Sequence, residues 1–331
     1  MISILVTGAS GFIGGHLAAR LAADGHRVRG LVRKTSDPAF LHGTPVELRA
    51  GDVTDPASLR PAMEGIEVVV HAAGYVSDWG PLEAFRAVNV GGTRNVAEAA
   101  AAGGARRLLH VSTAAIHGFE GFRNRDETAP PVPSIFPYCE TKREAEEWLF
   151  AFARTSPLEV TAVRPGNVFG PRDRMFSEAY LDALAEGKAG YVGGGRRWTC
   201  PVYVENLVDA LVLACFEPAA RGEAFLITDG LEIDWRTFTE ALAAAIGAEP
   251  PGLSIPFPLA YAAAWTMEAV FRGLRRPKPP RLTRYRICNG GRDYHFSIEK
   301  ARRLLKHEPR VGFAEAVRRT AEWYRNRPRP E

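Results

Sequence analysis

The sequence predicts an α/β protein with a doubly wound, mostly parallel sheet of about seven strands and a smaller C-terminal α/β lobe. Short runs rich in β-branched residues alternate with longer stretches of helical pattern, as in βαβ units. The run Val68-Val69-Val70 is continuously apolar, which is typical of a strand covered on both faces of its sheet. With 331 residues, 46% of them hydrophobic, the chain is long enough for one large domain and an appended lobe.

The elements are expected in a regular alternation. Strands are predicted at residues 2–6, 27–32, 46–50, 68–71, 107–112, 159–164 and 224–228. Helical patterns between them cover residues 12–23, 93–102, 138–154 and 205–215. After about residue 170, glycines, aromatic residues and proline-rich breaks become frequent. We therefore expect a sheet domain over residues 1–170, which late strands from 200–230 join, and a smaller lobe over residues 171–331.

Composition excludes several classes of protein. The excess of 42 Lys and Arg over 38 Asp and Glu is mild, so it suits an anionic ligand better than a nucleic-acid partner. The four cysteines form no CxxC pair, and the sequence predicts neither a metal site nor a disulfide framework. We find no signal-peptide pattern and no run of the about 20 apolar residues that a spanning helix needs. A cytoplasmic location is expected.

A glycine-rich turn follows the first strand. The sequence TGASGFIG begins at Thr7 and places three glycines in GxxGxxG spacing directly before a helix. The first glycine permits the tight turn, the second lets the backbone approach a pyrophosphate at the helix N-terminus, and the third allows close packing. This context predicts a Rossmann-type dinucleotide-binding domain. The predicted contacts are Gly8, Ser10, Gly11, Phe12, Ile13 and Gly14.

The end of the second strand indicates which dinucleotide binds. An acidic residue there would bind the adenosine ribose and select NAD, but the chain has Arg33 and Lys34, which suit a 2′-phosphate. The sequence thus favours NADP(H), with NAD(H) as the alternative. Asp52 and Val53, after the third strand, are expected to contact the adenine unless they only precede a helix. Ala72 and Ala73 are small enough for a cofactor to lie flat beside them.

Three polar residues predict an oxidoreductase site. Tyr138 and Lys142 are four apart at the start of a predicted helix, so they share one helical face. A nearby ammonium lowers the pKa of a phenol from about 10, and Tyr138 can then exchange a proton with an alcohol or carbonyl. Thr113, 25 residues upstream at the end of a strand, would hydrogen-bond the same oxygen. Lys142 would also hold the nicotinamide ribose.

Taken together, these motifs resemble the extended short-chain dehydrogenase/reductase family. TGASGFIG, HAAG, NVGGT, STAAIHG, YCETK and RPGNVFGP stand in the family's order over nearly the whole chain. The resemblance implies that Asn89 supports the active-site lysine through a water and that Pro165, Gly166 and Val168 border the nicotinamide. It also implies a homodimer through the helices at 93–102 and 138–154.

The C-terminal half resembles the 3β-hydroxysteroid dehydrogenase and sterol-4α-carboxylate 3-dehydrogenase (decarboxylating) branch. The segments VYVEN, AFLITD and FSIEKAR carry this resemblance. It implies hydride transfer to or from a 3β-hydroxyl or 3-keto group of a sterol-like or other bulky lipid. If the substrate carries a 4-carboxylate, oxidation gives a β-keto acid that loses CO₂.

Two other activities on the same scaffold stay open: a nucleotide-sugar 4-epimerase and a reductase of 3-oxo fatty-acid-like substrates. Dehydration is disfavoured because Ala114 and Ala115 stand where dehydratases of this family have carboxylates. The arginine that clamps the diphosphate in sugar enzymes is replaced by Thr199 or Cys200, although Arg196 and Arg197 are near.

Large apolar side chains in and near the lobe suit a flat hydrophobic ligand. The predicted substrate contacts are Tyr75, Trp79, Phe136, Tyr191 and Trp198, with Arg172 as a weaker candidate for holding a carboxylate. The alternative is that each of these aromatic side chains only packs in the core of the lobe. Residues 255–278 are apolar and aromatic and end in cations, which is typical of a peripheral contact with an anionic membrane. The alternative is a lid over the pocket.

Overall fold

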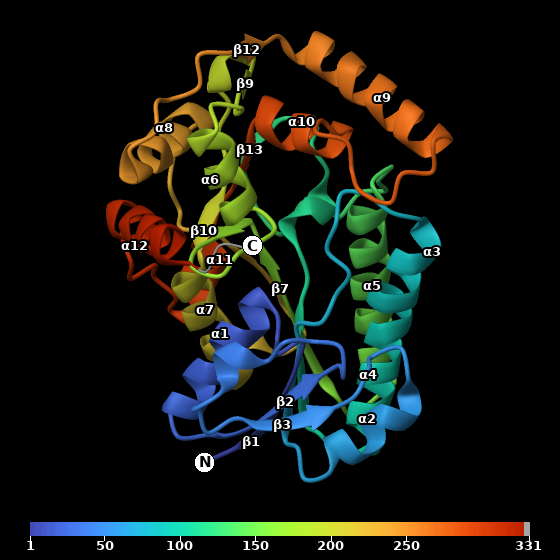
Figure 1. Ribbon diagram of the computed structural model, residues 1–331. Helices are drawn as coiled ribbons and strands as arrows, with labels where there is room; N and C mark the ends of the chain where they lie inside the picture. Colours follow the sequence, from blue (N-terminus) through green and yellow to red (C-terminus); the bar gives the residue numbers. More distant parts are fainter. Residues whose placement is uncertain (328–331) are drawn as a thin grey trace.

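The computed structural model describes residues 1–327 and is built around a seven-stranded parallel sheet (Figure 1). The strand order is β11–β7–β5–β4–β1–β2–β3, and each neighbouring pair is parallel. These strands are β1 (Ser3–Thr7), β2 (Arg27–Val32), β3 (Glu47–Ala50), β4 (Val68–His71), β5 (Arg107–Val111), β7 (Glu159–Pro165) and β11 (Ala224–Ile227). They match the seven predicted runs, and the predicted fold class is confirmed.

Helices cover both faces of the sheet (Figure 1). One face carries α1 (Phe12–Ala23) and α7 (Val204–Phe216), and the other carries α2 (Pro56–Met63), α4 (Gly92–Ala102) and α5 (Pro137–Ala153). Successive strand residues point to opposite faces, so Ile4 and Val6 pack in the first core while Leu5 packs in the second. Burial on both faces explains why these strands read as continuous apolar runs.

The strand order reverses between β1 and β4, which makes a crevice at the carboxyl ends of these two strands. Ligands of open α/β sheets bind at such a switch point. The glycine-rich turn follows β1, and Ala72 and Ala73 follow β4. The topology therefore brings both predicted cofactor segments to one edge of the sheet.

Most of the remaining elements lie beyond that edge, whereas the helices within residues 299–326 pack beside α7 (Figure 1). Three two-stranded parallel sheets pair β8 (Asn167–Phe169) with β10 (Pro201–Tyr203), β9 (Tyr191–Val192) with β12 (Ser254–Ile255) and β6 (Phe122–Arg125) with β13 (Tyr294–Phe296). The other helices are α3 (Leu82–Phe85), α6 (Ser177–Ala185), α8 (Trp235–Ile246), α9 (Phe257–Gly273), α10 (Arg284–Gly291), α11 (Glu299–Leu305) and α12 (Phe313–Asn326). Of the late strands, β11 lies in the main sheet and β10 pairs with β8. The domain boundary near residue 170 stays a prediction.

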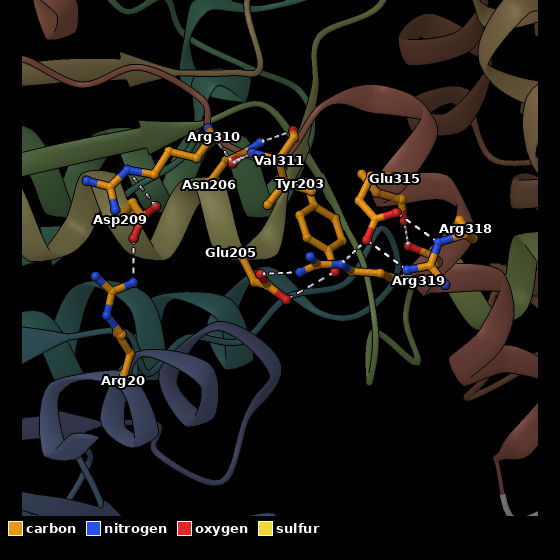
Figure 2. A network of polar contacts seen from close by, with 12 residues as sticks. Arg20, Tyr203, Glu205, Asn206, Asp209, Arg310, Val311, Glu315, Arg318 and Arg319 are labelled. Carbon is orange, nitrogen blue, oxygen red and sulfur yellow. Dashed lines mark hydrogen bonds and ion pairs between the residues drawn. The ribbon is translucent and has the colours of Figure 1, made fainter. Parts of the chain in front are cut away.

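A polar network joins the C-terminal segment to α7 (Figure 2). The fully buried Asn206 accepts hydrogen bonds from the backbone N–H groups of Arg310 and Val311 at 3.0 and 2.9 Å. Arg319 of α12 pairs with Glu205 at 2.8 Å. Because α7 packs on the main sheet, these contacts fix α12 to the same body as the cofactor-binding edge.

Candidate active site

The glycine-rich turn is as tight as the sequence predicts. Gly8 has a φ of +68°, and a Cβ atom there would lie 2.8 Å from the Cα of Ala73. A Cβ atom on Gly14 would lie 2.3 Å from the Gly8 carbonyl oxygen. Within residues 1–327, no side chain caps the N-terminus of α1 at Gly11, so its first N–H groups are left for an anion. These residues fit the pyrophosphate of a dinucleotide.

The predicted adenosine contacts meet at the ends of β2 and β3. Arg33 and Lys34 are both exposed there. Hydrogen bonds from the Thr54 backbone and hydroxyl, at 2.9 and 2.8 Å, hold the pKa of Asp52 below its usual value, and the charge of Arg33 acts in the same direction. Asp55, rather than Asp52, caps α2 by accepting from a backbone N–H. Asp52 therefore lies near Arg33, so two of the predicted adenosine contacts are close together.

Backbone contacts hold the segment after β4 against the turn after β1. The backbone N–H of Ala73 donates to the Thr7 hydroxyl at 3.2 Å, and Ala72 lies next to it. Val53 is buried against Gly92, and its carbonyl accepts from Asn95 at 2.8 Å. The side chain of Val53 is thus little exposed, so only its backbone is left for the predicted contact with the adenine.

The predicted catalytic residues come together beyond the end of β5. Thr113 follows this strand, and its hydroxyl lies close enough to Tyr138 to act on the pKa of the phenol. Burial nevertheless raises the pKa of Tyr138 to about 12, which Thr113 opposes only in part. Burial also lowers the pKa of Lys142 to about 8, and its Nζ donates to the Val111 carbonyl at 2.7 Å. The pKa of Tyr138 is therefore raised rather than lowered in this structure, because desolvation of the phenol dominates and Lys142 is not among the groups that act on it.

Two buried histidines that sequence reasoning missed link Lys142 to the glycine-rich turn. His110 Nε2 lies 3.3 Å from Lys142 Nζ, and the His110 and His71 rings are 5.4 Å apart. His71 Nδ1 lies 2.8 Å from the Thr7 hydroxyl. Burial lowers the pKa of His71 to about 3 and that of His110 well below its usual value, so both rings are neutral. Their only sequence signal is a polar residue inside an otherwise apolar strand.

Asn89 also lies beside the catalytic helix. It is buried in the π-helical turn Arg86–Gly91, a form that occurs often at functional sites. Its amide donates to the Thr141 hydroxyl at 3.0 Å and accepts from the Tyr75 backbone N–H at 2.7 Å. Asn89 thus fixes the residue that precedes Lys142, while its water-mediated role stays a prediction.

The predicted nicotinamide segment runs from the end of β7 into β8. Pro165 is the last residue of β7, and Val168 pairs with Val202 of β10. Gly166 has no room for a side chain, because a Cβ atom there would lie 2.3 Å from the Cys200 carbonyl oxygen. This segment is therefore held rigidly by the strands on either side of it.

A cluster of aromatic rings and thiols, which we call the aromatic cluster, surrounds Tyr138. Its rings include Phe119, Phe136, Phe257, Tyr261 and Tyr285, and its thiols are Cys139, Cys200 and Cys288. The Tyr285 ring packs edge-on at 5.3 Å from Phe119 and 5.5 Å from Phe136. Phe136, a predicted substrate contact, thus belongs to this cluster, whereas Tyr285 of α10 was missed because nothing local distinguishes it.

The other predicted substrate residues lie outside the aromatic cluster. Tyr75 packs on Phe85 at 4.5 Å between ring centroids, and Trp79 packs on Phe271 of α9 at 6.5 Å. Elsewhere in the lobe, Tyr191 packs under Arg236 and Trp198 packs under Arg123 and against His295.

Arg172 also lies away from the aromatic cluster. Its guanidinium carbon is 3.4 Å from the centroid of the Phe40 ring, beside α1. This position does not support the suggested contact with a substrate carboxylate, because Phe40 and α1 belong to the cofactor-binding side. Within residues 1–327, no group of three or more His, Cys, Asp or Glu side chains is arranged to hold a metal ion.

Comparison with known proteins decides the family. The model of the NAD dependent epimerase/dehydratase family matches residues 4–227. The chain belongs to this family. It is therefore an NAD(P)-dependent oxidoreductase of the extended short-chain dehydrogenase/reductase type.

Similar proteins have differing substrates. A 2-alkyl-3-oxoalkanoate reductase of Stenotrophomonas maltophilia (strain K279a) is 31% identical, over 96% of this chain and 98% of the relative. The decarboxylating sterol-4-alpha-carboxylate 3-dehydrogenase of Mus musculus is 30% identical, over 96% of this chain and 89% of the relative. The solved UDP-glucose 4-epimerase of Thermus thermophilus, in complex with NAD, has a TM-score of 0.78 and 26% identity over 98% of this chain and 99% of its own.

Proposed function

We propose that the protein transfers a hydride between NADP(H) and the hydroxyl or keto group at C3 of a sterol-like or other bulky lipid. The observation that carries this proposal is the aromatic cluster around Tyr138. Rings and thiols from α5, α9 and α10 pack in the cluster that Tyr138 contacts, and apolar, aromatic surroundings of this kind suit a flat hydrophobic ligand. The sterol dehydrogenase among the relatives supports the same substrate class.

The polar groups beside this cluster favour a lipid over a nucleotide sugar. Where sugar enzymes carry a diphosphate clamp, Thr199 is buried and accepts from the Asn167 amide at 3.1 Å. Arg196 and Arg197 are exposed and lie 4.0 and 3.9 Å from carboxylates of the protein itself. Neither arginine is therefore held ready for a diphosphate.

The residues of the chain divide the chemical work between them. Bound NADP(H) supplies or accepts the hydride at the substrate carbon. Tyr138 holds the substrate oxygen and moves its proton, with the Thr113 hydroxyl as the second hydrogen-bond partner of that oxygen. Lys142, fixed by the Val111 carbonyl, would hold the nicotinamide ribose.

The names of two relatives lead us to propose that the substrate carries a carboxylate. A sterol-4-carboxylate oxidised at C3 and a 2-alkyl-3-oxoalkanoate both carry their C3 oxygen function one carbon away from the carbon that bears the carboxylate. We propose a substrate of this β-oxygenated, α-branched kind. Oxidation of such an acid gives a β-keto acid, which loses CO₂ because the ketone stabilises the resulting enolate.

A second proposal concerns α9, which has two different faces. Phe257 and Tyr261 belong to the aromatic cluster, so one face of the helix covers the site as a lid. The other face exposes Leu259 and Trp265, with 64% and 57% of their surfaces accessible, and four cations follow near its end, at residues 272, 275, 276 and 278. Within residues 1–327, no helix has the length and apolarity needed to span a bilayer.

We propose that this outer face contacts an anionic membrane from which the lipid enters. The protein should co-sediment with vesicles of phosphatidylglycerol. Trp265→Glu should reduce this binding and leave turnover of a soluble substrate unchanged. Equal binding of the wild type and the variant would contradict this role.

We also propose a homodimer through α4 and α5, where Trp148 and Phe152 stack at 5.1 Å near the surface.

Turnover assays test the central proposal. Purified protein is offered a 3β-hydroxysteroid, a 4-carboxysterol, a 2-alkyl-3-oxo acid and a UDP-sugar, with NADP(H) and NAD(H) supplied separately. Turnover of the lipid acids, and its loss in Tyr138→Phe, is the expected result. Turnover of the UDP-sugar alone would overturn the lipid assignment and favour the epimerase.

A further inference from the structure

Arg172 is held in an unusual backbone conformation. It follows the Gly-Pro turn after β8 and has a φ of +73°, in the left-handed region that non-glycine residues rarely adopt. Strain of this kind persists where surrounding contacts impose it, and it is frequent at ligand-binding sites. The position of the side chain therefore needs an explanation.

The guanidinium is packed but incompletely paired. It stacks on the Phe40 ring at 3.4 Å, and its Nη1 atom is buried without a hydrogen-bond partner among the described residues. Burial lowers the pKa of Arg172 to about 10, and the charge of Arg174 acts in the same direction while Asp37 opposes it. The group is thus still a cation at neutral pH, and its Nε and Nη2 atoms are not buried and have no hydrogen bond among the described residues.

The guanidinium lies against α1. A Cβ atom on Gly15 would come within 3.0 Å of Arg172 Nη1. Because Cα–Cβ bonds tilt toward the N-terminus of a helix, a group at this place lies on the side of α1 that leads toward its first turn. The contact of His16 Nε2 with the Pro171 carbonyl, at 3.0 Å, fixes the whole turn on α1.

We infer that Arg172 binds a phosphate of the dinucleotide from the side opposite the free N–H groups of α1. A guanidinium fork matches the oxygens of a phosphate and forms strong charge-assisted hydrogen bonds with them. This assignment accounts for the backbone strain, the accessible donors of the guanidinium without a partner and the missing side chain at Gly15. The phosphate that Arg172 binds belongs either to the pyrophosphate, which NADH and NADPH share, or to the 2′-phosphate of NADPH.

Cofactor titration tests the assignment. Arg172→Met keeps a side chain over Phe40 but removes the charge, and Arg174→Met removes an exposed charge two residues away. Dissociation constants for NADH and NADPH are measured by the fluorescence of the reduced nicotinamide, without substrate. A lost charge-assisted pair should weaken binding about 10- to 100-fold in Arg172→Met, and Arg174→Met should bind like the wild type.

The two cofactors distinguish the sources of the phosphate. Equal weakening for both identifies the pyrophosphate, and weakening for NADPH alone identifies the 2′-phosphate. Unchanged constants for both cofactors in a folded Arg172→Met protein would overturn the inference, as would a rise confined to the KM of the lipid substrate. Arg172→Lys, which keeps the charge without the fork, gives intermediate constants and serves if the Met variant does not fold.

Discussion

Lys142 allows a quantitative test of the buried catalytic site. Its side chain is almost fully buried, and burial lowers its pKa from the usual 10.5 to about 8. Because one pKa unit corresponds to about 1.4 kcal/mol, the folded protein disfavours the charged amine by about 3 kcal/mol. This cost is present whenever Lys142 is protonated in both the folded and the unfolded chain.

The sign of the pH dependence follows from the two pKa values. Between about pH 8 and pH 10.5 the unfolded chain holds a proton on Lys142 that the folded protein has lost. The free energy of unfolding contributed by this group therefore rises with pH across that window. Lys142→Met has no such proton, so its stability relative to the wild type should fall by about 3 kcal/mol between pH 7 and pH 10.5.

Urea unfolding of the wild type and Lys142→Met at several pH values measures this difference. Losing the hydrogen bond to the Val111 carbonyl shifts the two curves by a constant amount, so only the change of the gap with pH is diagnostic. Lys188→Met, which alters an exposed lysine, is the control and should show a nearly constant gap. If the difference in the free energy of unfolding between the wild type and Lys142→Met stays constant from pH 7 to pH 10.5, burial does not lower the pKa of Lys142 and the reasoning is refuted.

Three further substitutions test the rest of the site. Arg33→Ala should weaken NADPH binding about tenfold or more and leave NADH binding nearly unchanged, as measured by fluorescence titration. Gly14→Ala puts a Cβ atom 2.3 Å from the Gly8 carbonyl oxygen; it should cost about 1–3 kcal/mol in urea unfolding and abolish cofactor binding. Gly252→Ala, which meets no atom within 4 Å, should do neither. Tyr285→Ala should raise the KM for the lipid about tenfold at an unchanged Kd for NADPH, since the ring packs on Phe119 and Phe136; an unchanged KM would remove α10 from the substrate site.

Local patterns predicted the sheet and the cofactor turn. The strands were predictable because each is a short apolar run bounded by turn residues, and GxxGxxG works through the backbone of a single strand–helix connection. The spacing of Tyr138 and Lys142 likewise depends only on the helical period. These features therefore need no knowledge of distant contacts.

The features that sequence analysis missed depend on contacts between distant segments. Tyr285 reaches the aromatic cluster only because α10 brings it against Phe119 and Phe136, and Arg172 is placed by Phe40 and Gly15, far away in the sequence. The pKa of Tyr138 was misjudged for a related reason. Helical spacing gives the nearness of Lys142, but the desolvation that raises the pKa comes from rings of several elements.

Isotope transfer tests the central claim most directly. A 4-carboxysterol carrying deuterium at C3 is incubated with NADP and the wild-type protein or Tyr138→Phe, and the reduced cofactor is analysed by mass spectrometry. The account predicts deuterium in the NADPH formed by the wild type, release of CO₂, and neither product with Tyr138→Phe. Unlabelled NADPH from the wild type, or equal labelling by the variant, would contradict hydride transfer from C3 with Tyr138 as the proton-transferring group.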